Sequence, residues 1–355
     1  MPQRLAGSLA DMNSSPTQTN TVSSADTTAE ALSHVGEEYA RLHAHWACRA
    51  AFPLIVILLV LSQVGIGLAV YHGWIWLGLP AVLLASHFMH GALIGFHEAS
   101  HGLLRKSRLL NEIDGIIVGT LSFVSFTLYR VAHQTHHAHL GTERDEELWP
   151  FVIVDSPRWF RRLIAFIELN AGLLFTPYLF ARVFLRKGSF IKSGKVRRRI
   201  WAEFGLMAVF WVLVISAVGY LNVWAYFFWA YLVPGVIAGN MQSWRKYIEH
   251  VGLRGHTSNS ATRNIISHSW SGRLLSLTLL HEPFHGVHHW RAGLPHTELP
   301  KHAALLAPTV EGDVPPFPNY RSAIKDLLRN LPDPRSGSHW PDAKSISENL
   351  AKTAC

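Results

Sequence analysis

The chain has 355 residues, of which 49% are hydrophobic and only 16% are charged, against roughly 25% charged in typical soluble domains. With 13 tryptophans and several unbroken apolar runs, this composition argues against a soluble globule and indicates an integral membrane protein. Two cysteines are too few for an intrinsic iron–sulfur cluster or a disulfide framework. The net charge of +8 could suggest nucleic acid, but Lys and Arg stand beside apolar segments, so we expect no nucleic-acid partner.

The beginning of the chain is polar and leads into a first apolar hairpin. Residues 1–32 are rich in Ser, Thr and Ala and poor in large apolar side chains, so we expect them to be disordered. Residues 33–49 have a helical spacing and approach the membrane. Residues 51–71 and 74–96 carry no Asp, Glu, Lys or Arg, and each is long enough to cross a bilayer core of about 30 Å. We therefore predict two spans joined by a short turn.

A second hairpin is expected further along the chain. Residues 115–128 are apolar but too short to span comfortably, so they should lie in the interface or dip into it. Residues 163–184 carry several polar side chains and fit an interfacial or protein-covered segment. Residues 200–220 and 223–241 form the predicted second pair of spans. Residues 314–355 are rich in Pro, Ser and Lys and are expected to form a peripheral C-terminal tail.

These segments predict an all-α integral membrane fold with four transmembrane helices in two hairpins. Basic stretches at residues 105–108, 186–199 and 245–246 mark one side of the membrane as cytoplasmic. Residues 33–313 would form one membrane domain, whose cytoplasmic helical cap carries the histidine-rich segments. The N-terminus, the C-terminus and the active site are then expected on the cytoplasmic side of a multi-pass protein.

Histidine is the unusual residue, with 22 in the chain and many in tight groups. One H-x3-H group, two H-x2-H-H groups and one further histidine near the end of an apolar run make up the candidate metal ligands: His97, His101, His133, His136, His137, His250, His285, His288 and His289. Side chains three and four residues apart share one face of a helix, so each group can offer several imidazoles to one point. Because a zinc site takes three or four ligands, nine candidates fit two metal ions better than one. The spacing does not identify the metal, since imidazole binds Fe, Cu, Zn and Ni.

Other classes of protein remain possible on these residues. His97-Glu98-x-x-His101 alone is the signature of a zinc metalloprotease, with the glutamate as general base, but it leaves the two later groups unexplained. A second apparent H-E-x-x-H begins at His281, where Pro283 interrupts the helix. We place His281 at or before the start of that helix and leave it out of the ligand set, with its role open. A membrane transporter is a further alternative, because intramembrane histidines can line ion paths.

The order of the three groups resembles the histidine boxes of the membrane fatty acid desaturase superfamily. The similarity extends to LNEI at residues 110–113, to TERD at residues 142–145, and to RKYIEHVGL at residues 245–253, which resembles bacterial desaturases and alkane hydroxylases. It covers roughly residues 40–305. The resemblance implies a non-haem diiron centre, held by the nine histidines, that uses O2 to abstract hydrogen from an unactivated C–H bond. Glu98, Glu249 and Asp145 would hydrogen-bond the ligands and orient them.

The resemblance implies a fatty acid (acyl-lipid) desaturase, an oxidoreductase that forms a double bond in a lipid within the bilayer. A related hydroxylase or ketolase acting on an alkane, a carotenoid or a sphingolipid-like chain is the alternative, because both reactions begin with the same C–H cleavage. Electrons would come from an external donor of the ferredoxin, rubredoxin or cytochrome b5 type. A basic cytoplasmic face would attract an acidic donor.

Overall fold

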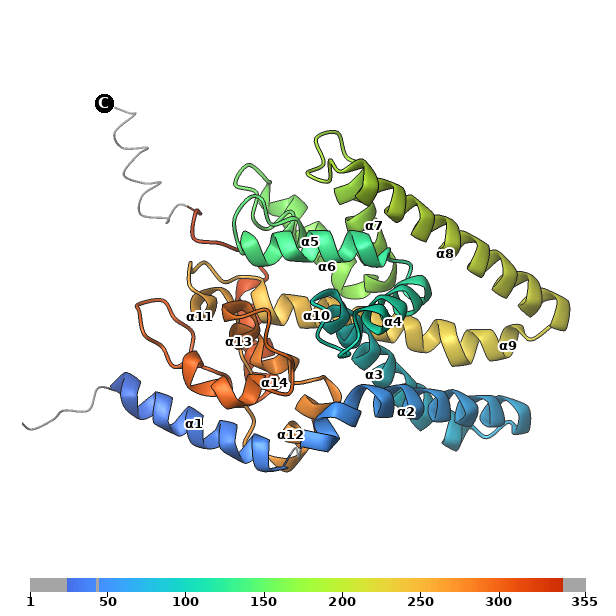
Figure 1. The fold of residues 1–355 in the computed structure, drawn as a ribbon, viewed down its shortest axis with the longest axis horizontal. Helices are drawn as coiled ribbons and strands as arrows, with labels where there is room; N and C mark the ends of the chain where they lie inside the picture. The colour runs from blue at the N-terminus through green and yellow to red at the C-terminus, as the bar shows by residue number, and fades with distance from the viewer. Residues whose placement is uncertain (1–23, 43–44, 341–355) are drawn as a thin grey trace, which may run out of the picture.

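The computed structural model describes residues 24–42 and 45–340, and the regular secondary structure of this part of the chain is helical (Figure 1). Its only β pairing among those residues is a single parallel bridge between Ile265 and Phe317. The helical elements follow one another as α1 (Ser24–Leu42), α2 (His45–His72), α3 (Ile75–Ser100), α4 (Arg108–Leu121), α5 (Phe126–Ala138), η1 (Glu146–Leu148), α6 (Arg158–Asn170), α7 (Gly172–Leu185), α8 (Gly194–Leu221), α9 (Trp224–Phe227), η2 (Phe228–Leu232), α10 (Val233–His250), α11 (Ser258–Ala261), α12 (Trp270–Thr278), η3 (Glu282–Phe284), α13 (His285–Trp290), η4 (Leu299–Leu306) and α14 (Tyr320–Asn330).

Three of these helices are long and apolar enough to cross a membrane. They are residues 49–72 of α2, the whole of α3 and the whole of α8. The first two form the expected hairpin, whose turn is made by Gly73 at φ +72°, a backbone conformation that glycine adopts without steric cost. Three of the four predicted spans therefore correspond to long apolar helices.

The fourth predicted span, residues 223–241, is helical but interrupted. It consists of α9, a π-helical turn (η2) and the first part of α10, with helical φ and ψ at the junction residues Phe228 and Val233. The chain therefore stays helical from Trp224 to His250, and the π turn is a local irregularity within this helix. In Figure 1, α9 runs back beneath α8 and leads into α10 at the centre of the molecule. The arrangement as two full transmembrane hairpins stays a prediction.

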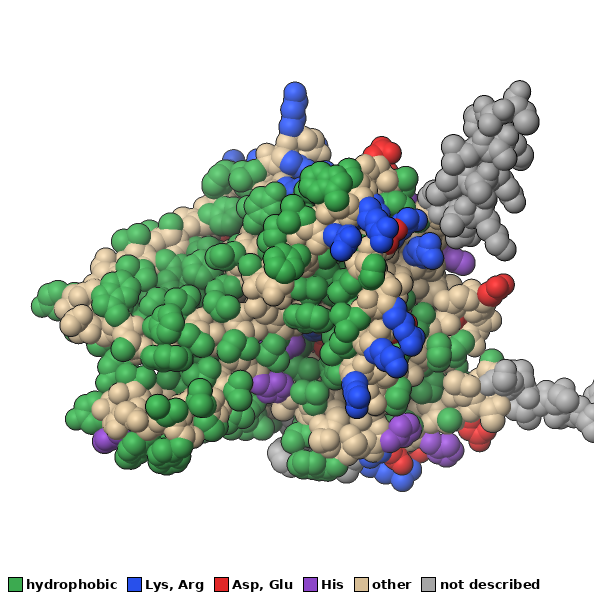
Figure 2. Space-filling view, turned by 180° about the vertical axis from the view of Figure 1, so that it is seen from behind, with side chains coloured by type: hydrophobic (Ala, Val, Ile, Leu, Met, Phe, Trp, Pro, Cys, Tyr) green, Lys and Arg blue, Asp and Glu red, His purple; other side chains and the backbone are tan. Residues whose placement is uncertain are grey.

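The surface is divided in the way that a membrane protein requires. Large exposed hydrophobic side chains gather on the spans, including Leu61, Leu83 and Val209, each at least half exposed. Figure 2 shows apolar side chains over the end of the molecule formed by α2, α3, α8 and α9, while Lys and Arg side chains gather toward the opposite end. The apolar end would face lipid and the basic end would lie outside it.

Two apolar regions are divided between separate helices. α4 and α5 meet at an angle of 102°, with Phe123 in the left-handed region at the bend, so residues 115–128 do not form a straight span. Residues 163–184 are likewise divided between α6 and α7, which break at Ala171.

The two terminal segments are more ordered than the sequence suggested. α1 begins at Ser24, inside the stretch that we expected to be disordered, because Leu32, Val35 and Tyr39 pack with η4 in one apolar cluster. Near the other end, Ala323 and Leu327 of α14 are fully buried against α6, α7 and α10, so this part of the expected peripheral tail belongs to the core. Residues 1–23 and 341–355 lie outside the described residues.

Candidate metal centre

The nine candidate ligands come from four helix ends that meet in the interior. The first histidine box ends α3, the second lies in the last turns of α5, the third forms α13, and His250 ends α10. Helix ends from distant parts of the sequence thereby bring all nine side chains together.

The nine imidazoles divide into two adjoining groups. One group contains His97, His101, His133, His137 and His288, each of which offers one nitrogen that lies within 4.8 Å of the other four. The second is formed around His250, which has His136 and His289 on one side and His285 with Glu249 on the other. The groups touch where the rings of His137 and His289 stack, with centroids 4.3 Å apart.

Each H-x2-H-H box contributes to both groups. In α5, His133 and His137 belong to the first group and His136 to the second. In α13 the assignment is reversed, because His288 joins the first group while His285 and His289 join the second. On a helix, residues four apart lie nearly in line, while a residue three apart points further to one side. One box can therefore reach two neighbouring histidine groups.

The free nitrogens in these groups suit bound cations. Within the described part of the chain, Nε2 of His97, Nε2 of His101 and both nitrogens of His288 are buried without a hydrogen-bond partner. In the second group, Nε2 of His285 lies 2.8 Å from Nε2 of His250 and 3.1 Å from that of His289. Buried polar atoms usually have partners, and converging imidazole nitrogens are the donor set of a transition-metal site, so the residues fit two metal ions.

Carboxylates stand behind several of these imidazoles. Asp145 accepts a hydrogen bond from Nδ1 of His136 at 2.9 Å, as expected from the sequence, and also accepts one from the backbone nitrogen of Gly141. Glu147, which the sequence did not single out, pairs with Nδ1 of His133 at 3.0 Å. A carboxylate that holds Nδ1–H fixes the tautomer in which Nε2 is free to bind metal.

The other two expected carboxylates are placed differently. Glu98 accepts a hydrogen bond from the backbone nitrogen of His296 at 3.3 Å, and among the described residues it makes no hydrogen bond to an imidazole. Oε2 of Glu249 lies 3.6 Å from Nε2 of His285, on the side that faces the second group. Both oxygens of Glu249 also accept hydrogen bonds from Arg245, at 2.9 and 2.8 Å.

A further buried carboxylate, Glu282, was missed from the sequence. Arg245 contacts Glu282 as well as Glu249, so one guanidinium lies between two buried carboxylates. Burial would raise the pKa of Glu282, but His97 and Arg245 hold it well below its usual range. Burial and the neighbouring Glu282 raise the pKa of Glu249 well above its usual range. Burial lowers the pKa of His285 to about 4, which keeps the ring neutral, the form that binds a metal.

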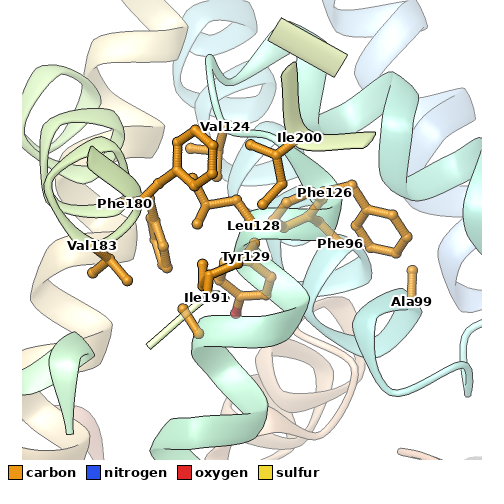
Figure 3. Close-up of a cluster of buried hydrophobic side chains, with 12 residues drawn as sticks. Phe96, Ala99, Val124, Phe126, Leu128, Tyr129, Phe180, Val183, Ile191 and Ile200 are labelled. Carbon is orange, nitrogen blue, oxygen red and sulfur yellow. The ribbon is translucent and has the colours of Figure 1, made fainter. Parts of the chain in front are cut away.

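The helix that carries the second box is fixed at its other end by α8. Ser125 caps the N-terminus of α5, and its hydroxyl donates to Glu203 of α8 at 2.6 Å, as the backbone nitrogen of Thr127 does at 2.9 Å. Figure 3 shows the apolar cluster around this helix, in which Phe96, Tyr129 and Phe180 lie together. The ring of Tyr129 stacks on that of His133 at 5.3 Å, which connects the cluster to the candidate ligands.

His281 lies outside the two groups. It has φ +54° and stands immediately before η3, as the sequence predicted for a residue at the start of this helix. Its Nδ1 is 3.3 Å from Nδ1 of His296, and the two rings stack.

Similarity to known proteins places the chain in a family. Residues 73–320 match the family model for fatty acid desaturases. The chain belongs to the fatty acid desaturase family. It is similar to an sn-1 acyl-lipid omega-3 desaturase (ferredoxin) of Synechocystis sp., at 29% identity over 147 residues, which is 40% of each chain. It is also similar to a chloroplastic omega-3 fatty acid desaturase of Glycine max, at 30% identity over 111 residues, which is 30% of this chain and 24% of the relative.

The similarity to individual desaturases is partial. A chloroplastic sn-2 acyl-lipid omega-3 desaturase (ferredoxin) of Arabidopsis thaliana is 29% identical over 122 residues, or 32% of this chain and 26% of that protein. The chain thus spans less than half of the length of each of these relatives.

Proposed function

We propose that this protein is an O2-dependent diiron desaturase that introduces a double bond into the acyl chain of a membrane lipid. The observation that carries the proposal is the convergence of nine histidines from three boxes and α10 into two adjoining groups. Two neighbouring metal positions rich in imidazole, with free Nε2 atoms, would hold a pair of irons. When bound, such a pair supplies the O2 activation needed to remove hydrogen from an unactivated C–H bond.

The protein's own residues would orient and protect this centre. Asp145 and Glu147 hold Nδ1 of His136 and His133, so that the opposite nitrogens face inward. Most of the nine rings are buried, with His133, His136 and His288 each at most 4% exposed. Exclusion of water from the site would prevent side reactions of activated oxygen.

A small cavity with a mainly apolar lining lies near the histidines. It lies between α3, α5, α7 and α10 and is lined by Phe96, Val124, Leu173, Phe180 and Tyr129, among others. Tyr129 stacks on His133, so the cavity wall reaches the first histidine group. Its volume of about 50 Å³ is below the roughly 300–1,000 Å³ of a typical ligand pocket, so the helices around it would have to move apart before a hydrocarbon chain from the bilayer could lie along these side chains.

Electrons would come from an external donor, and we favour a ferredoxin because two of the relatives carry that donor in their names. Rubredoxin and cytochrome b5-type proteins are the other candidates. We infer that the site and both termini face the cytoplasm, because the basic residues lie on the side of the molecule away from its apolar end. An acidic donor would be attracted to this side.

The experiment is expression of the full chain, with ferredoxin and its reductase, in a host that lacks the activity. Gas chromatography with mass spectrometry of total fatty acids should show new species that have lost two hydrogens, and intact-lipid analysis should locate them in acyl lipids. His288→Ala should abolish the product, because it removes a ligand of the five-histidine group. His268→Ala is the matched control, since His268 is exposed and outside both groups.

The outcomes separate the reactions. New acyl chains with an added oxygen would identify a hydroxylase and refute the desaturase. Unchanged fatty acids together with altered hydrocarbons or pigments would refute the acyl substrate while retaining the metal centre. One zinc and no iron in the purified protein would refute the diiron centre and favour the protease alternative.

A further inference from the structure

Glu282 occupies a position between the two histidine groups. Its Oε2 accepts a hydrogen bond from Nδ1 of His97 at 3.2 Å, and its Oε1 lies 3.0 Å from Nδ1 of His285. His97 belongs to the five-histidine group and His285 to the group around His250. One carboxylate therefore contacts an imidazole of each group on the nitrogen that points away from the metal position.

The other carboxylates differ from Glu282 in this respect. Asp145 contacts His136 of the second group, and Glu147 contacts His133 of the first. Each of them thus supports one position. Glu282 is also more enclosed than Glu147, with 1% of its surface exposed against 9%.

The backbone around Glu282 is built to hold it there. Leu280 and His281 have φ of +49° and +54°, a left-handed conformation that costs energy in residues other than glycine. The amide of His281 donates to the carbonyl of Ser276 at 2.7 Å, which closes the turn. Glu282 then opens η3, one turn before His285, and Arg245 binds its carboxylate from α10. Strain of this kind persists only where the surrounding contacts require it.

We propose that Glu282 is a positioning residue that couples the two metal positions: one oxygen accepts a hydrogen bond from Nδ1 of His97, the other holds Nδ1 of His285 by a close electrostatic contact, and both contacts favour a free Nε2. This inference rests on the proposed diiron centre. Arg245 has its own part in this arrangement, because its guanidinium binds the same carboxylate from α10 and holds it beside both rings. Removal of a carboxylate behind one ligand typically costs 10–100-fold in metal affinity, and at Glu282 the loss should affect both metals.

The test measures metal binding by the purified full-length protein in lipid nanodiscs, without substrate. Fe(II) is titrated anaerobically, iron per chain is determined by elemental analysis, and the two iron sites are followed by Mössbauer spectroscopy. We expect Glu282→Gln to weaken the binding of both irons by about 10–100-fold and to change both Mössbauer components. Asp145→Asn and Glu147→Gln should each change one component. Glu168→Gln is the structural control, since Glu168 is equally buried beside Lys246 and contacts no candidate ligand.

A second variant separates geometry from charge. Glu282→Asp keeps the negative charge for Arg245 but shortens the side chain, so its oxygens no longer reach both rings. If Glu282 serves only as a counter-ion, Glu282→Asp should bind two irons as the wild type does. If it couples the positions, at least one iron should bind more weakly. This variant also carries the test if Glu282→Gln does not fold.

The inference is overturned if Glu282→Gln changes one component or none, or if Glu168→Gln has the same effect. A wild-type protein that binds no pair of irons would instead refute the proposed function. The two failures are therefore distinguishable in one series of titrations.

Discussion

The contact between α7 and α10 leaves no room for a side chain at Gly239. A Cβ at this position would lie 2.7 Å from the backbone nitrogen of Leu173, 2.8 Å from its Cα and 2.9 Å from its Cβ. These are backbone or near-backbone atoms, which cannot rotate away as the end of a long side chain can. Gly239→Ala should therefore push apart the two helices that line the proposed substrate cavity.

Gly235, one turn earlier on α10, provides the control. A Cβ there would meet nothing within 4 Å. Replacing glycine by alanine in a helix gains up to about 1 kcal/mol, and this gain applies at both positions. Overpacking costs about 1–3 kcal/mol, and only at Gly239. Because the helix gain cancels, Gly239→Ala should be less stable than Gly235→Ala by about 1–3 kcal/mol.

The assay is thermal unfolding of both variants in the same nanodiscs at the same heating rate, since membrane proteins often unfold irreversibly. With an unfolding entropy of about 2.1 cal/mol/K per residue, a difference of 1–3 kcal/mol in this chain of 355 residues corresponds to about 1–4 °C in Tm. Gly239→Ala unfolding at the same temperature as Gly235→Ala, or above it, would show that α7 and α10 are not packed as described.

Three further results are expected. Glu203→Ala should destabilise the protein by about 3 kcal/mol or more, because it leaves the buried N-cap of α5 without its hydrogen-bond acceptor. Arg198→Ala, at an exposed position, should change stability by less than about 0.5 kcal/mol. Equal Tm values for the two variants would contradict the role of Glu203 in holding α5. Tyr39→Phe should cost about 0.5–1.5 kcal/mol, since it removes the hydrogen bond to the carbonyl of Ser267, and an unchanged Tm would show that this bond does not stabilise the contact of α1 with the segment before α12. Removal of iron by a chelator should lower the Tm of the wild-type protein, because a ligand that binds only the folded state stabilises it; no shift would argue against metal held by the folded chain.

The sequence predicted best those features whose residue pattern follows from a single physical requirement. A bilayer core demands about twenty apolar residues in a row, so residues 51–71, 74–96 and 200–220 could be read directly as long helices. The nine histidines could be selected for the same reason, because their spacing within each box is a helical one. The structure brings all of them together, while their role as ligands stays a prediction.

The features that the sequence did not reveal depend on contacts between distant segments. The π turn at Phe228–Leu232 has no marker in an apolar run, so residues 223–241 resembled any other span. Glu147 was one of several acidic residues after the second box, and only the fold places it against His133. Glu98 stands next to a ligand in sequence but points toward His296, since neighbours on a helix face in different directions.

The division of the nine histidines between two groups has a simple geometric origin. Boxes with residues at i, i+3 and i+4 lie on α5 and α13, and each directs its pair at i and i+4 to one group and its residue at i+3 to the other. The i and i+4 pair of α5 joins the first group, whereas that of α13 joins the second, so each group needs histidines from both boxes. His97 and His101 add to the first group and His250 to the second. Two positions then share one buried space, and a carboxylate such as Glu282, placed between His97 and His285, can influence both.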